Sequence, residues 1–69
     1  MSTFRTIRLI GTSAEYVFTV ALSQETNEVV AICNEIDIAS DGKTEMEALQ
    51  NIAEAIALYL SIENFKLIL

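Results

Sequence analysis

One amphipathic segment near the C-terminus limits this chain to folds in which a helix covers another layer. Residues 45–60 place apolar side chains at steps of three and four, the spacing of one helix face. Thr44 precedes the segment as an N-cap, and Glu47 follows three residues later, which completes a capping box. The predicted apolar face comprises Met46, Leu49, Ile52, Ala53, Ile56, Tyr59 and Leu60.

Two apolar residues do not follow this helical pattern. Leu58 falls among the polar positions, and Ile62 lies at the edge of the same region. They either form a second contact surface or are isolated exposed apolar side chains, which are common in proteins.

The residues before the helix are predicted to form strands. Residues 3–10 are rich in β-forming side chains, and residues 16–23 alternate between large and small or polar side chains. Residues 28–33 are apolar on both faces, so we expect a central strand or one whose second face meets another subunit. The connection at residues 24–27 predicts a hairpin between these last two strands.

Two shorter strands are expected near the helix. Residues 37–40 form one candidate, and residues 65–69 form the last. Asp41-Gly42 is predicted to be a turn in which Gly42 is free to take a positive φ. The fold class is therefore α+β, with an antiparallel three- to four-stranded sheet, one helix on one face and a possible extra N-terminal strand.

Size and composition predict one small domain that associates with itself or with a partner. The chain has 69 residues, of which 52% are hydrophobic, and this is more than a lone small domain easily buries. We expect a homo-oligomer, a dimer or larger. A leader, a glycosylation sequon and an apolar run of about 18 residues are all missing from the sequence, so we expect a soluble, cytoplasmic protein without membrane contact.

The charge balance favours protein partners over nucleic acid. Ten acidic residues stand against four basic ones, a net charge of -6. Direct nucleic-acid binding needs clustered Lys and Arg, which are scarce here. The acidity suits a basic protein partner, or it only keeps an apolar protein soluble.

The sequence offers no convincing catalytic centre, cofactor site or metal site. It contains no histidine, which excludes Ser-His and Cys-His dyads and ordinary zinc sites. Cys33 lies in an apolar stretch and is expected to be a small buried side chain. The acids Glu35, Asp37, Asp41 and Glu45 could hold a hard cation, but their spacing does not fit an EF-hand. Gly42-Lys43-Thr44 imitates the end of a P-loop but lacks its first glycine, which is replaced by Asp37.

The order of these segments resembles the HicB-like antitoxin family. The resemblance covers about two thirds of the chain and lies in residues 16–20, 29–33, 35–44, 47–49 and 54–60. The acid-rich turn, the Gly-x-Thr entry to the helix and the closing Leu-Tyr-Leu are its most specific parts. Asn34 replaces the usual proline before the turn, and Asp41 replaces the usual glutamine.

The resemblance implies a β-β-β-α-β fold like a truncated ribonuclease H fold, without its catalysis. We expect a single domain over residues 1–69, with residues 1–15 as an N-terminal strand extension and residues 16–69 as the family core. Family members mask a small basic RNA-cleaving toxin (HicA-like), and many carry a C-terminal DNA-binding domain. We expect this chain to lack that domain, because 69 residues leave no room for it.

Our leading hypothesis is an antitoxin-type module that is not an enzyme. The residues expected to contact the toxin, or to mediate self-association, are Glu35, Asp37, Asp41, Glu45, Glu47, Leu58 and Ile62. The alternative is an orphan homo-oligomer of the same fold with a structural, adaptor or small-ligand role. A third possibility is an enzyme that uses the acidic turn with a divalent metal.

Overall fold

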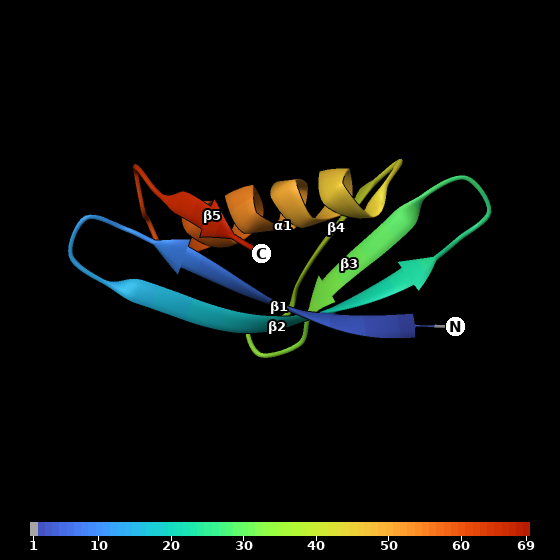
Figure 1. Cartoon of the computed structure of the whole chain (residues 1–69), viewed down its shortest axis with the longest axis horizontal. Helices are drawn as coiled ribbons and strands as arrows, with labels where there is room; N and C mark the ends of the chain where they lie inside the picture. Colours follow the sequence, from blue (N-terminus) through green and yellow to red (C-terminus); the bar gives the residue numbers. More distant parts are fainter. Residues whose placement is uncertain (1) are drawn as a thin grey trace.

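A computed structural model of the chain describes residues 2–69. Four strands precede the helix and one follows it (Figure 1). The elements are β1 (Ser2–Ile10), β2 (Glu15–Gln24), β3 (Val29–Cys33), β4 (Ile38–Gly42), α1 (Glu45–Tyr59) and β5 (Lys66–Ile68). All six lie at or close to the positions that the sequence patterns predict.

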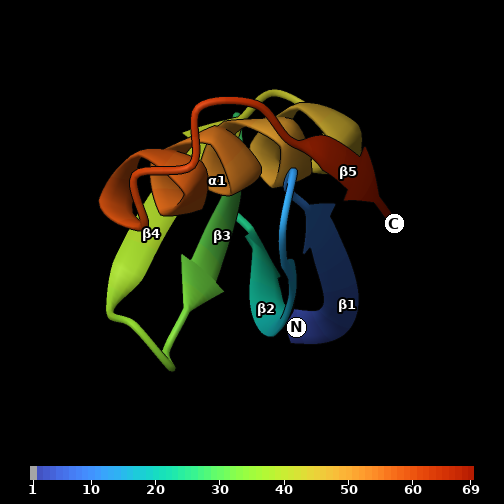
Figure 2. The same ribbon diagram turned by 90° about the vertical axis from the view of Figure 1, so that its left-hand side faces the viewer.

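The strands form one antiparallel sheet in the order β4-β3-β2-β1-β5. The sheet curls, and α1 lies on its concave side (Figure 2). The N-terminal residues add a strand to the sheet, because β1 pairs with β2 from Ser2 to Ile10. The α+β class with one helix on one sheet face is confirmed.

The core forms between the inner face of the sheet and one side of α1. Because strand side chains alternate, the pairs Ile7 with Phe18 and Leu22 with Ala31 point toward the helix. Burying such side chains stabilises the fold by roughly 1.5–3 kcal/mol for each large one. The buried cluster comprises Ile7, Leu9, Val20, Leu22, Val29, Ala31 and Cys33 of the sheet and Ala48, Leu49, Ile52, Ala53 and Ile56 of α1.

The helix ends depart from the predicted apolar face. Met46 is 53% exposed and Tyr59 is 62% exposed, whereas Ala48 and Ala57 are buried. Met46 and Tyr59 lie in the first and last turns, outside the stretch that the sheet covers. The 15-residue α1 is short, and no helix in residues 2–69 is long and apolar enough to cross a membrane.

The predicted role of Gly42 is wrong. Asp41 and Gly42 end β4 rather than forming a turn, and Gly42 does not have a positive φ. A Cβ atom at Gly42 would lie 2.5 Å from the amide nitrogen of Ala48. A glycine, which has no side chain, is needed at position 42 because the end of β4 packs directly against the first turn of α1.

The outer face of the sheet faces away from α1 and carries apolar side chains. Phe4 is 68% exposed and Val17 is 54% exposed, while Val30 and Ile32 of β3 are half-buried. As the sequence predicts, β3 is an interior strand with apolar residues on both faces.

Candidate protein-binding surface

Three of the predicted acidic residues, Asp41, Glu45 and Glu47, lie at or just before the start of α1. Thr44 caps the helix, and its hydroxyl oxygen accepts a hydrogen bond of 3.1 Å from the amide of Glu47. The carboxylate of Glu47 accepts a 2.8 Å bond from the amide of Lys43, one residue before the cap. The capping box thus forms, with its return bond shifted by one residue.

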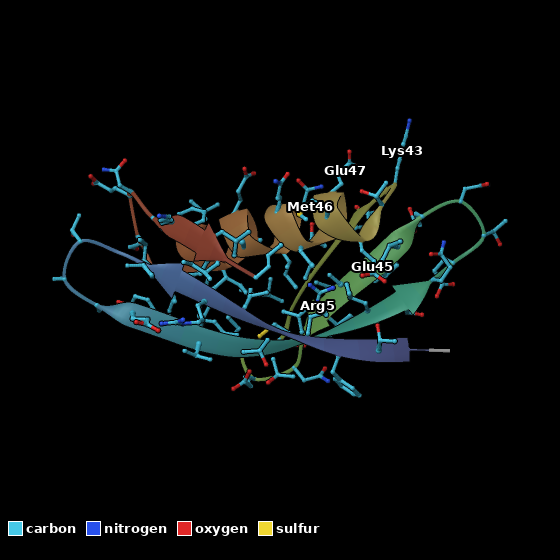
Figure 3. The ribbon with its side chains drawn as sticks, in the orientation of Figure 1. Arg5, Lys43, Glu45, Met46 and Glu47 are labelled. Atoms are coloured by element: carbon cyan, nitrogen blue, oxygen red, sulfur yellow. The ribbon has the colours of Figure 1, made fainter. Side chains whose placement is uncertain are left out.

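Glu45 is partly neutralised by a basic residue of β1. The guanidinium of Arg5 lies 3.3 Å from the carboxylate of Glu45, across the gap between the strand and the helix (Figure 3). An exposed pair of this kind contributes only about 0–1 kcal/mol, so a partner can displace it readily. In the same view Lys43 points away from this pair.

A pair of carboxylates lies beside the helix start. Protonated Glu28 can donate a hydrogen bond to Asp41, and the two ionised groups repel one another, so the pKa of Glu28 is raised above its ordinary value of 4.5. Glu28 follows the β2–β3 connection, and Asp41 lies near the end of β4, opposite Val30 of β3. The fold thus brings together two acids that are 13 positions apart in the sequence.

Residues at the end of β4 and at the start of α1, together with Glu28, surround a shallow depression of about 300 Å³. A lysine or guanidinium group entering it would meet carboxylates and amide oxygens together. The lining residues are Asn27, Glu28, Asp41, Gly42, Lys43, Glu47 and Asn51. We call this set the acidic depression. Sequence reasoning did not predict Asn27, Glu28 or Asn51. The sheet register brings Asn27 and Glu28 to the end of β4, and the packing of α1 against β4 brings Asn51 there.

The other two predicted acids lie elsewhere. Glu35 and Asp37 belong to the turn between β3 and β4, at the opposite end of β4 from Asp41. The carboxylate of Glu35 accepts a 2.9 Å hydrogen bond from the amide of Thr19 in β2. Asp37 has a φ of 56°, a left-handed conformation that Asp tolerates better than most residues. The predicted acidic residues therefore divide into two groups and do not form one surface.

The predicted apolar contact of Leu58 and Ile62 at the end of α1 is only partly exposed. Leu58 is 82% exposed, but Ile62 is half-buried. The amide of Ile62 donates to the carbonyl of Ala57 at 2.8 Å, and Ser61 takes a φ of 59°, which together form a Schellman motif. The exposed apolar residues of this region are Leu58 and Tyr59, and Tyr59 was assigned to the core from its spacing.

A second cavity of about 350 Å³ lies between the β1–β2 loop and the segment after α1. Ser61 and Ile62 line it together with Tyr16, Gly11 and Thr12. Its charged lining is limited to Glu63, so it offers mainly hydroxyl groups and apolar surface.

The structure shows where the residues considered for chemistry, Cys33 and the acidic cluster, lie. Cys33 is fully buried, and burial raises the pKa of its thiol above the ordinary value of 9.0. From Ser2 to Leu69, no three acidic or cysteine side chains come close enough together to hold a metal ion. Of the four acids considered for a cation, Glu35 and Asp37 precede β4, Asp41 lies near its end, and Glu45 begins α1 and pairs with Arg5.

The fold and this surface define a small α+β module with an acidic depression beside the helix start. No family model, no curated protein and no solved structure matches the chain.

Proposed function

We propose that this chain is an antitoxin-type, protein-binding module that masks a small basic RNA-cleaving toxin. Its net charge of -6 and its resemblance to HicB-like antitoxins support this function. The order of elements from β2 to β5 is β-β-β-α-β, the order that the resemblance implies for a truncated ribonuclease H-like core. In this proposal β1 is an addition to that core.

The observation that carries the proposal is the carboxylate pair of the acidic depression. Glu28 and Asp41 repel one another when both are ionised, and Glu47 lines the same depression. A lysine or arginine of a partner would relieve this repulsion and form charge-assisted hydrogen bonds. The proposed binding energy therefore comes from Glu28, Asp41 and Glu47.

The remaining predicted residues have smaller roles in this proposal. Glu45 would have to break its ion pair with Arg5 before it could bind a partner, so it adds little net binding energy. Glu35 and Asp37 are too far along β4 to share the same contact and serve the turn instead. Residues 47, 50, 54 and 58 recur along the exposed side of α1, so a partner lying along the helix can also reach Leu58.

The proposal is tested in two steps: a search for a neighbouring partner gene, and co-purification of the partner with this chain. A small basic reading frame next to this gene would be co-expressed with the tagged chain and co-purified. The double variant Glu28→Gln with Asp41→Asn is expected to lose the partner. The control, Asp37→Asn with Glu63→Gln, makes an equal change of charge away from the acidic depression and is expected to retain the partner. Equal retention by both double variants would reject the acidic depression as the contact.

The alternative function is an orphan homo-oligomer with a structural, adaptor or small-ligand role. The exposed Phe4 and Val17 and the hydroxyl-rich cavity beside Ser61 favour it. The lack of a neighbouring basic reading frame, with no protein recovered in a pull-down from the native host, would favour this alternative over the antitoxin.

A further inference from the structure

One edge of the sheet is open along half of β1. The last strand, β5, pairs with β1 only at Arg8–Ile10, opposite Lys66–Ile68. Before Arg8, β1 has β2 on one side and no other strand of residues 2–69 on the other (Figure 1). An open edge of this kind is a template for another strand.

The hydrogen bond of Thr19 identifies the backbone groups that face this edge. The amide of Thr19 donates to Glu35, so it does not bond to Thr6, the residue opposite it in β1. Because backbone groups of a strand alternate between its two sides, the N–H and C=O groups of Phe4 and Thr6 point away from β2. They face the open edge.

The other edges carry features that oppose pairing. Beyond the end of β3, the carboxylate of Glu35 caps the amide of Thr19 on the unpaired side of β2. On β4, the side-chain amide of Asn51 donates a 2.8 Å hydrogen bond to the carbonyl of Asp41. The strand β5 is three residues long. Side-chain caps and short strands are common protections of sheet edges, and the first half of β1 lacks them.

The charges of β1 allow a second copy of the chain to pair at this edge. Copies of net charge -6 repel one another over most of their surface. The strand β1 contains no acidic residue, and its two arginines are balanced by Glu45 at 3.3 Å and Glu15 at 2.6 Å. Here two copies can approach without placing acid against acid.

We propose that two copies of the chain pair antiparallel through β1 around a two-fold axis at Phe4. The open backbone groups centre on Phe4, so this register places Phe4 opposite Phe4 of the second copy and Arg5 opposite Thr3. A register centred on Arg5 would set two arginines directly opposite. The Phe4 side chain, 68% exposed in one copy, is covered by its equivalent.

Disulfide trapping tests the register. Opposed residues of a hydrogen-bonded antiparallel pair have Cα atoms about 5.5 Å apart, within the range that a disulfide bridges. Phe4→Cys is expected to form a covalent dimer under mild oxidation. Val17→Cys, exposed on the same sheet face but one strand away from the open half of β1, is expected to remain largely monomeric on a non-reducing gel. Cys33 is buried and does not interfere. Equal cross-linking of the two variants would overturn the proposal.

Light scattering over a concentration series tests the association itself. The wild type is expected to become dimeric with rising concentration, and Phe4→Glu is expected to remain monomeric because two carboxylates would oppose each other. Val17→Glu makes the same change of charge, lies opposite Arg8 and is expected to dimerise like the wild type. A wild type that stays monomeric at millimolar concentration, or loss of the dimer in Val17→Glu alone, would contradict pairing through β1. This outcome is independent of whether the acidic depression binds a basic protein.

Discussion

The backbone of Gly42 lies against the amide of Ala48, leaving no room for a side chain between β4 and the first turn of α1. A Cβ atom added to Gly42 would lie 2.5 Å from the Ala48 nitrogen and 2.8 Å from the Glu47 carbonyl carbon. This approach fixes the helix start beside the acidic depression.

Gly42→Ala is expected to destabilise the protein by about 1–3 kcal/mol, because the backbone of α1 must move to admit the methyl group. At Gly11 an added Cβ would meet Ala14 at 3.4 Å and Ile62 at 3.6 Å, which the structure can accommodate. Gly11→Ala is therefore the control and should stay within about 1 kcal/mol of the wild type. Chemical denaturation of the two variants measures the difference, and equal stabilities would refute the close approach.

Ser61→Gly should stabilise the chain. Ser61 ends α1 in a left-handed conformation, which costs a residue with a side chain roughly 1–2 kcal/mol. Glycine removes this strain but has more freedom when unfolded, so the expected net gain is about 0.5–1 kcal/mol. Thermal unfolding measures the gain. A lower melting temperature than that of the wild type would argue against the Schellman ending.

Removing the helix cap should weaken the fold by a predictable amount. Thr44→Ala deletes the hydroxyl that accepts the amide of Glu47, at an expected cost of about 1 kcal/mol. Thr44→Ser keeps the acceptor and should be nearly neutral. If serine were as harmful as alanine in a denaturation series, the loss would come from the threonine methyl group rather than from the cap.

The carboxylate pair of the acidic depression should make stability depend on pH. The pKa of Glu28 is raised in the folded state, so the native protein retains this proton at pH values where the unfolded chain has lost it. The stabilisation is fully present below the unfolded value, near 4.5, and is lost as the pH rises through the folded value.

Glu28→Gln removes this contribution, so the difference in melting temperature between variant and wild type should change across that pH window. Glu63→Gln serves as the control, since Glu63 has no ion pair in the part of the chain described. Parallel pH profiles for wild type and Glu28→Gln would show that the two carboxylates do not interact.

The local patterns predicted most of the fold because each depends on neighbouring residues. The alternation in β2 and the cap at Thr44 are readable from a few positions. Gly42 was misinterpreted because its constraint comes from the close packing of β4 against α1, which spacing does not reveal. Met46 and Tyr59 follow the apolar period but extend past the sheet, so the period alone overstated the core.

The candidate surface was only partly predictable from the sequence. Asp41 and Glu47 were predicted and line the depression together. Glu28 was missed because it reaches Asp41 only through the β2–β3–β4 register. Glu35 looked like a free acid in a turn, yet its carboxylate binds the Thr19 amide across the sheet edge. Sequence position indicates which residues carry charge, but it does not indicate which charges are already partnered.

Calorimetric titration of the chain with a basic partner at several salt concentrations tests the central claim most directly. If the acidic depression provides the contact, affinity should fall steadily as salt rises, and the Glu28→Gln with Asp41→Asn double variant should bind weakly with a shallower salt dependence. Binding that is insensitive to salt, or that survives unchanged in the double variant, would contradict the proposed function.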